Sequence, residues 1–503
     1  MAFESSSDAA RKSPPCALVI FGASGDLTQR KLIPAIERLA RRGRLPREFA
    51  LVGVARSHMS DEDFAQRCRD SARRAGGETS ASWTEITDHI RYVCGGYDDP
   101  GTYDKLADVL HEADSTRGTA GNRVYYLATP PTVFAPAVIG LAKGGLNVGA
   151  EPDSFARVVI EKPFGHDEES AKELYTHISA AFDESDIFRI DHYLGKDTVQ
   201  NLLALRFANS IFEPIWNRTW VDSAQITVSE TLGVEGRGGF YETAGAMRDI
   251  VQNHVLQVLS LFLMEPPTSF HPEAIRDEKV KLLRAIRIPR GEKIRRDAVR
   301  GQYTRGGTRG NLMAGYREEP DVDPLSKTET YAALRLDIDN WRWSDVPIYV
   351  RTGKRLPKRM TKVTLQFRRP PHLPLFPKEI KDMAPDSLVL HVQPEEGISL
   401  RFGAKVPGHT FQVRTASMDF SYGTGFPEKS PEAYERLILD STIGDPTLFI
   451  RADEVGRSWR IVDPITEYWA TDEDAPIPFY PAASWGPREA GELIERDGRS
   501  WLE

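Results

Sequence analysis

A glycine-containing turn near the start of the chain has the composition of a phosphate-binding loop. The run Gly22-Ala-Ser-Gly-Asp-Leu27 follows the apolar stretch Ala17–Phe21 and precedes a helical pattern. Glycine lets the backbone approach a ligand closely, and the N–H groups of such a turn and of the helix start bind a pyrophosphate. The spacing departs from GxGxxG, because Ser24 and Leu27 stand where the second and third glycines would be. We predict a dinucleotide-binding loop, against the alternative of an ordinary strand–helix turn, formed by Gly22, Ala23, Ser24, Gly25, Asp26 and Leu27.

The end of the second predicted strand indicates which dinucleotide would bind. An acidic residue at this position hydrogen-bonds the ribose 2′-OH of NAD, whereas an arginine accommodates the 2′-phosphate of NADP. The sequence reads Val54-Ala-Arg-Ser57, with no acid next to Arg56. Arg56 therefore favours NADP, unless it is a plain surface arginine.

Four further motifs follow in order along the chain. They are Glu161-Lys-Pro-Phe-Gly165, Arg189-Ile-Asp-His-Tyr-Leu-Gly-Lys196, Glu235-Gly-Arg-Gly-Gly-Phe240 leading into Arg248-Asp-Ile-Val-Gln-Asn-His254, and Arg351-Thr-Gly-Lys354. Together with the glycine turn they resemble the glucose-6-phosphate dehydrogenase family, from about residue 16 to about residue 465. The Arg189–Lys196 motif is highly specific, whereas Glu-Lys-Pro also resembles the wider group of sugar oxidoreductases with a Rossmann domain.

The resemblance implies an NADP-dependent enzyme that oxidises D-glucose 6-phosphate at C1 to 6-phosphoglucono-1,5-lactone, the first oxidative step of the pentose phosphate pathway. His254 would be the general base and Asp191 its orienting carboxylate. Lys162 would lie between cofactor and substrate, followed by a proline, Pro163, that is often cis in the family. Further substrate contacts would come from His192, Tyr193, Lys196, Glu230, Asp249, Lys354 and Arg359. The resemblance also implies a homodimer or homotetramer built on a large sheet, and it leaves open a second, structural NADP site.

The residue types agree with this chemistry. Oxidising a hemiacetal to a lactone needs a base for the hydroxyl proton, and histidine titrates near neutrality. A carboxylate that accepts the other imidazole N–H fixes the tautomer of the base. The cofactor accepts the hydride, so no metal is required, and a phosphate group needs several cations and donors. Two assignments stay open: Glu230 could form a salt bridge instead of binding sugar, and Lys358 could take the role of Arg359.

Two other functions compete with the dehydrogenase. An oxidoreductase of an unphosphorylated sugar would keep the glycine turn and Glu-Lys-Pro, but it would not need His192, Lys196 and the region around Lys354 together. A dinucleotide sensor without activity would not need His254 and Asp191. The presence of all these residues favours the dehydrogenase over both alternatives.

Two domain types must position these residues. Up to about residue 190, short apolar runs alternate with helical patterns, which predicts βαβ units and a doubly wound parallel sheet of Rossmann type. The predicted strands are Ala17–Phe21, Ala50–Ala55, Arg91–Cys94, Val124–Thr129 and Val158–Glu161; the predicted helices are Leu27–Arg42, Asp61–Gly76 and Thr102–Ala113.

Beyond about residue 200 the pattern is that of an α+β domain with a large, mostly antiparallel sheet. Its predicted strands are Ala224–Leu232, Thr330–Ile338, Val346–Val350, Val363–Phe367, Ser387–Val392, Ile398–Phe402 and Phe411–Phe420; its predicted helices are Thr243–Met264, Pro431–Ile443 and Ala452–Val462. We expect a disordered tail over residues 1–15, a dinucleotide-binding domain over 16–195, and a substrate and oligomerisation domain over 196–503.

Composition narrows the class of protein. The net charge of −8 argues against a nucleic-acid-binding protein, although Arg351–Arg369 holds eight Lys or Arg and no acid. Such a local basic patch suits a small anionic ligand, or it is a solvated charge run at a strand edge. No apolar run approaches the roughly 18 residues of a membrane helix. Three cysteines without CxxC spacing indicate a reduced, cytoplasmic protein with neither a disulfide framework nor a zinc site.

Overall fold

The chain forms two compact units. The computed structural model describes residues 11–77, 80–308, 310–370, 384–409, 411–425, 430–472 and 477–502. Within these, the first unit runs up to Gly195 and also includes Ser269–Arg276 and Pro431–Gly456, and the second unit contains the remainder. The division expected from the sequence, 16–195 and 196–503, does not separate the two later segments that belong to the first unit.

The end of the expected N-terminal tail makes defined contacts. The Arg11 guanidinium pairs with Asp445 at 2.6 Å and with Asp440 at 3.1 Å. The N–H of Ser13 donates to the carbonyl of Arg44 at 2.9 Å. These contacts fix residues 11–15 on the first unit, while residues 1–10 lie outside the described part of the chain.

A seven-stranded sheet is the centre of the first unit. Its spatial order is β17 (Phe449–Ile450), β6 (Ile187–Ile190), β5 (Ala156–Ile160), β4 (Arg123–Leu127), β1 (Cys16–Phe21), β2 (Phe49–Ala55) and β3 (Arg91–Cys94). Neighbouring strands pair in parallel, except that the two-residue β17 is antiparallel to β6. The order 3-2-1-4-5-6 of the parallel strands is the doubly wound arrangement that the sequence predicts.

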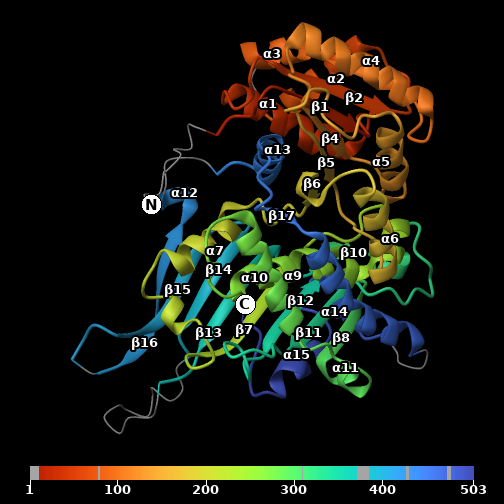
Figure 1. The fold of residues 1–503 in the computed structure, drawn as a ribbon. Coiled ribbons are helices and arrows are strands. Elements are labelled where there is room, and N and C mark those ends of the chain that lie inside the picture. The colour runs from red at the N-terminus through yellow and green to blue at the C-terminus, as the bar shows by residue number, and fades with distance from the viewer. Residues whose placement is uncertain are drawn as a thin grey trace. The chain divides into compact units, whose positions relative to one another are not determined.

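Helices of this unit begin and end where the sequence provides caps. Figure 1 shows α1 (Ile33–Arg41), α2 (Asp61–Arg74), α3 (Ala81–Asp88), α4 (Pro100–Arg117), α5 (Phe134–Lys143), α6 (Glu168–Ser179) and α13 (Ala433–Ile443). The short π-helix η2 (Thr28–Leu32) precedes α1. The side chain of Ser60 caps α2 by accepting from the N–H of Asp63, whose carboxylate accepts from Ser60 in return. α4 has Asp99 as its N-cap, a proline at its first position, and Gly118 in the left-handed conformation at its end.

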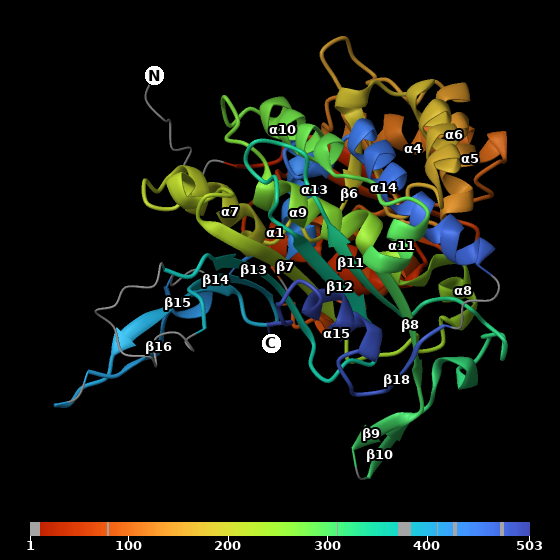
Figure 2. The same ribbon diagram turned by 90° about the horizontal axis from the view of Figure 1, so that it is seen from below.

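A nine-stranded sheet is the centre of the second unit. Its spatial order is β16 (Val413–Ser421), β15 (Gly397–Lys405), β14 (Ser387–Gln393), β13 (Met360–Phe367), β7 (Val221–Ser229), β12 (Ile348–Gly353), β11 (Tyr331–Leu336), β8 (Ala298–Thr304) and β18 (Phe479–Pro481). Only the β7–β12 and β8–β18 pairs in this sheet are parallel, which confirms the predicted mostly antiparallel sheet. Figure 2 shows β15 and β16 at one end of the sheet and the small hairpin of β9 (Gly306–Thr308) and β10 (Asn311–Met313) beyond β8.

The helices of the second unit include α7 (Asp197–Phe207), α11 (Glu292–Asp297) and α15 (Arg488–Glu495). In α10 (Pro272–Ala285) and α14 (Ala452–Thr471) the chain passes from one unit to the other. No helix of the described residues is long and apolar enough to cross a membrane.

One predicted helix is divided in the structure. The sequence predicts a single helix over Thr243–Met264, whereas the structure has α8 (Gly238–Ala246), the π-helix η6 (Met247–Val255) and α9 (Leu256–Leu263). The break falls at Gly245, whose φ of +62° and ψ of 176° are not helical. A Cβ at Gly245 would lie 2.3 Å from a carboxylate oxygen of Glu329, so the close approach of that side chain requires glycine.

Candidate active site

The glycine turn joins β1 to η2 in a conformation that requires glycine. Gly22 has a φ of +83°, and a Cβ there would lie 2.3 Å from the carbonyl oxygen of Ala128 at the end of β4. The Thr28 hydroxyl donates to the carbonyl of Gly22 at 3.0 Å, and the N–H of Gly25 donates to the same oxygen at 2.9 Å. The first N–H groups of the helix that follows have no intrahelical acceptor. This turn therefore fits the phosphates of a dinucleotide.

Arg56 lies at the end of β2, beside this turn. The hydroxyl of Ser57 donates to that of Ser24 at 2.9 Å, which ties the two loops together. Arg56 is exposed, and its guanidinium has no hydrogen bond or ion pair to the described residues. Asp26, by contrast, is paired with Arg30 at 2.6 Å on the exposed surface. Arg56 is thus available to an incoming anion beside this turn, where the exposed Arg67 guanidinium also donates to the carbonyl of Ser24 at 3.3 Å.

The ends of β5 and β6 hold the next group of predicted residues. These strands are parallel neighbours, so the residues that follow them lie at the same edge of the sheet. Lys162 lies two residues after the end of β5 and is joined to Pro163 by a cis peptide bond, the isomer that is often found in the family that the chain resembles. Asp191 follows β6, is 1% exposed, and accepts the N–H of Tyr193 at 2.9 Å in a tight turn.

His192 occupies that turn between two aromatic rings. The centroid of its ring lies 5.0 Å from that of Tyr193 and 6.4 Å from that of Tyr434 on α13, to which it is nearly parallel at 8°. Gly195 closes the turn, and a Cβ there would lie 3.0 Å from Ala433. The start of α13 therefore lies directly behind the turn that carries His192.

In the second unit, strand register brings Glu230 and Lys354 together. β7 and β12 are parallel, and their last residues, Ser229 and Gly353, are partners. The next residue of each strand follows at the same edge, where the Lys354 ammonium donates to Glu230 at 2.7 Å. Lys354 also lies 3.9 Å from Asp249 and 5.0 Å above the ring of Tyr241. Glu230 therefore has the partner that a half-buried carboxylate requires.

The same edge of the sheet carries Arg359 and Lys196. β13 is antiparallel to β7 and begins beside Ser229, so the exposed Arg359 precedes it at this edge, next to Lys358. Lys196, just before α7, donates to the side-chain oxygen of Gln393 at 2.8 Å, at the end of β14. Three neighbouring strands, β12, β7 and β13, therefore place Lys354, Glu230 and Arg359 at one edge, and the end of β14 beside them accepts from Lys196.

The π-helix η6 carries Asp249 and His254 against β7 and β12. Its start is held by Glu329, whose carboxylate accepts the N–H of Met247 at 3.1 Å and whose carbonyl accepts that of Ala246 at 3.0 Å. A carboxylate at a helix N-terminus is favoured by the helix dipole. Glu329 is buried, and burial raises its pKa. His254 itself is 1% exposed.

Comparison with protein families identifies the family of this chain. Residues 19–201 match the model of the glucose-6-phosphate dehydrogenase NAD binding domain, and residues 203–502 match that of the glucose-6-phosphate dehydrogenase C-terminal domain. The chain belongs to the glucose-6-phosphate dehydrogenase family. The match of the first unit to an NAD binding domain supports a nicotinamide dinucleotide as the cofactor.

Individual relatives agree over the whole chain. Glucose-6-phosphate 1-dehydrogenase 2 of Mycobacterium tuberculosis is 46% identical over 499 residues, which are 98% of this chain and 95% of the relative. The glucose-6-phosphate 1-dehydrogenase of Bacillus subtilis is 42% identical over 490 residues, which are 97% and 99% of the two chains. A solved glucose-6-phosphate dehydrogenase in complex with its substrate glucose 6-phosphate has a TM-score of 0.89 at 36% identity, covering 98% of this chain and 99% of that one.

The basic stretch Arg351–Arg369 divides into paired and exposed charges in this member of the dehydrogenase family. The Arg351 guanidinium is buried, with its carbon 4.8 Å and 4.6 Å from the ring centroids of Trp485 and Trp501. Arg355 pairs with two glutamates, Glu235 at 3.2 Å and Glu319 at 3.3 Å. The cations that remain exposed are Lys358, Arg359, Arg368 and Arg369. Part of the stretch is therefore structural, and only part of it is accessible to an anion.

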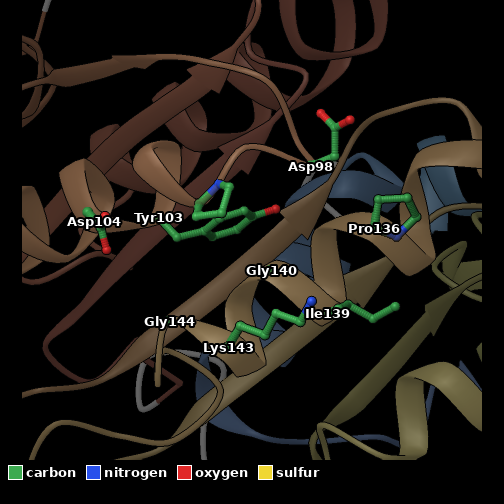
Figure 3. Close-up of a pocket in the computed structure, with 9 residues that line it drawn as sticks. Asp98, Tyr103, Asp104, Pro136, Ile139, Gly140, Lys143 and Gly144 are labelled. Atoms are coloured by element: carbon green, nitrogen blue, oxygen red, sulfur yellow. The ribbon is translucent and has the colours of Figure 1, made fainter.

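A surface pocket elsewhere on the first unit contains none of the predicted site residues. Its volume is about 250 Å³, and it lies between α4 and α5 (Figure 3). Tyr103, Ile139 and Lys143 are among the residues that line it. The phenol of Tyr103 donates into the protein, to the carbonyl of Tyr97 at 2.5 Å, and away from a ligand.

Four residues with a defined place in the site escaped the sequence analysis. Glu329 accepts a hydrogen bond from the start of η6, and Gln393 accepts one from Lys196. Glu161 is buried and interacts with Tyr434, whose ring lies beside that of His192. Only Glu161 lies inside a motif, next to Lys162. The other three lie in segments where no spacing or composition marks them as polar partners.

Proposed function

We propose that this chain is an NADP-dependent glucose-6-phosphate 1-dehydrogenase, which oxidises C1 of D-glucose 6-phosphate to 6-phosphoglucono-1,5-lactone in the first oxidative step of the pentose phosphate pathway. The contacts of Lys354 carry the proposal: this lysine follows β12 and lies near Glu230, which follows β7, and near Asp249, which lies on the same helix as His254. Carboxylates suit the hydroxyl groups of a sugar, and cations suit its phosphate.

In this proposal His254 takes the proton of the C1 hydroxyl, and Asp191 accepts the other N–H of its imidazole. His192, Tyr193 and Lys196 bind the phosphate and the sugar, and Glu230 and Asp249 accept sugar hydroxyls. Lys354 and Arg359 add positive charge, and Lys162 lies between cofactor and substrate. These roles are supported by the family to which the chain belongs and by the sheet edges at which the residues lie.

NADP, when bound, accepts the hydride from C1. The residues proposed to hold it are those of the Gly22–Leu27 turn and Arg56, since the turn fits phosphates and the arginine is available to a 2′-phosphate. We assign cofactor binding to the first unit, and most of the proposed substrate contacts and oligomerisation to the second. The three cysteines are free, which supports a reduced compartment such as the cytoplasm.

A homodimer or homotetramer built on the large sheet is part of the proposal. β16 is an end strand of that sheet, and it exposes Met418 and Phe420 by 63% and 37%. An exposed end strand with apolar side chains is a template for pairing with another chain. Substituting Met418 by lysine would shift the oligomer towards smaller species in size-exclusion chromatography with light scattering.

The test of function is NADPH formation by the purified protein. We expect fast turnover with glucose 6-phosphate and NADP, and slow turnover with glucose and NADP or with glucose 6-phosphate and NAD. Preference for glucose over its phosphate would replace the proposal with an oxidoreductase of a free sugar. A protein that binds cofactor but turns over none of these mixtures would instead be a sensor.

A further inference from the structure

A buried carboxylate lies behind the residues proposed to contact phosphate and cofactor. Glu161, the residue after β5, is 9% exposed and accepts a hydrogen bond from the Tyr126 phenol on β4 at 2.6 Å. The phenol of Tyr434 on α13 also interacts with this carboxylate: it lowers the pKa of Glu161, and the carboxylate in turn raises the pKa of the phenol. Tyr126 is fully buried and Tyr434 is 9% exposed. Two phenols from two elements therefore converge on one carboxylate within the first unit.

This carboxylate is linked to two of the proposed site residues. The peptide of Glu161 continues directly into Lys162 and the cis bond to Pro163. The ring of Tyr434, on the other side, lies nearly parallel to that of His192. Because the start of α13 packs directly behind Gly195, a movement of α13 would reach the turn that carries His192. A substitution at Glu161 can therefore change the positions of two proposed site residues, Lys162 and His192.

Keeping this carboxylate in place costs free energy. Burial raises the pKa of Glu161 to about 6, although hydrogen bonds from Tyr126 and Tyr434 and the charge of Lys162 favour the carboxylate. An apolar residue would fill the same space without that cost. A strand end that needed only packing would not require an ionisable group.

We propose that Glu161 is a positioning residue that acts through Tyr434 to hold the His192 imidazole and through its own backbone to hold Lys162. The inference rests on the proposed function, since it takes from it the substrate contact of His192. Tyr434 is then a second positioning residue, whereas Tyr126 anchors the carboxylate without contacting the site.

Two matched variants separate this role from simple anchoring. Tyr434→Phe and Tyr126→Phe each remove one phenol that interacts with Glu161, but only the ring of Tyr434 stacks with that of His192. We expect Tyr434→Phe to raise the KM for glucose 6-phosphate about 5- to 10-fold, part of the effect of a charge-assisted hydrogen bond, while kcat and the KM for NADP change less than about twofold. Tyr126→Phe should leave all three parameters within about twofold. Equal effects of the two variants would overturn the proposal.

Substitution of the carboxylate itself gives the rescue test. Glu161→Gln keeps an oxygen that accepts from Tyr434, and Glu161→Leu keeps only the volume. We expect Glu161→Gln to retain a KM within about threefold of the wild type and Glu161→Leu to raise it more than about tenfold. A Glu161→Leu protein that folds and has a normal KM would overturn the proposal.

A readout without turnover separates failure of this proposal from failure of the proposed function. The chain has 11 histidines, so the NMR spectrum of protein labelled at histidine has few imidazole signals. The signal that is lost in His192→Asn is that of His192. We expect the His192 signal to shift in Tyr434→Phe and to stay in place in Tyr126→Phe. An unchanged signal in both variants would refute the positioning role whatever the enzyme turns over, and a wild type inactive on glucose 6-phosphate would refute the proposed function alone.

Discussion

The pair formed by Lys354 and Glu230 makes a quantitative prediction about substrate binding. Its 2.7 Å contact is a charge-assisted hydrogen bond, and the Lys354 side chain is 13% exposed. Such bonds contribute about 1.5–3 kcal/mol, and the 37% exposure of the Glu230 side chain reduces this through solvent screening to about 1–2 kcal/mol. We therefore expect the two residues to be coupled by about 1–2 kcal/mol in catalysis, which corresponds to roughly 5- to 30-fold in kcat/KM.

The assay is a double-mutant cycle of Glu230→Gln, Lys354→Met and the double variant, followed as kcat/KM for glucose 6-phosphate. Lys354→Met removes an ammonium that contacts two carboxylates, Glu230 and Asp249, at a site for an anion, so we expect a loss of about 100-fold or more. Adding Glu230→Gln removes one of those charges and should restore part of the activity. The KM for NADP should stay within about twofold throughout.

An exposed ion pair of the same unit serves as the control for this cycle. Arg305 and Glu318 approach to 3.1 Å with both side chains largely in solvent. Glu318→Gln should change kcat/KM less than about twofold, since exposed pairs contribute little. If the loss of kcat/KM in the double variant equals the product of the losses in the two single variants, with a coupling of no more than about 0.3 kcal/mol, the two side chains do not act as one unit and the reasoning is refuted.

Three further substitutions test other parts of the proposal. His254→Asn should lower kcat by roughly 10²–10⁴-fold with sugar binding near normal, in steady-state kinetics and isothermal titration, and a nearly active variant would remove His254 from the role of base. Arg56→Ala should raise the KM for NADP about tenfold or more and leave that for NAD within about twofold; equal effects on both would contradict the 2′-phosphate contact. Gly245→Ala should lower the thermal unfolding temperature and the activity, because its Cβ would meet Glu329 at 2.3 Å. Gly236→Ala, also at positive φ but with open space around the new Cβ, should have a smaller effect, and an equal effect would mean that backbone strain alone matters.

The sequence predicts those parts of the fold in which a strand is buried along its whole length. β1 and β2 are buried at every residue, so each reads as an unbroken apolar run between turn residues. The predicted bounds of these strands differ from the observed ones by one residue. Cap residues such as Ser60 likewise mark a helix start from local chemistry alone.

Contacts between distant segments could not be predicted in this way. Tyr434 reaches Glu161 from a helix that lies far along the chain, and the apolar pattern of that helix reports its buried face but not its partner. The apolar residues of the π-helix η6 do not distinguish it from an α-helix, and the break before it lies at Gly245, against the side chain of the distant Glu329. β17 has two residues, which is too short for any periodicity, yet it joins the segment after α13 to the sheet of the first unit.

Strand direction explains why the second unit gathers its site residues although its sheet is mostly antiparallel. Antiparallel neighbours leave the sheet at opposite edges, so two strands that are followed by site residues must be parallel to bring those residues together. β7 and β12 are such a pair, and they are followed by Glu230 and Lys354. β13 runs the other way beside β7, so the residue that precedes it, Arg359, lies at the same edge. A register shift of one residue in the β7–β12 pair would separate Glu230 from Lys354. The contact between this carboxylate and this ammonium therefore depends directly on the register of the two strands.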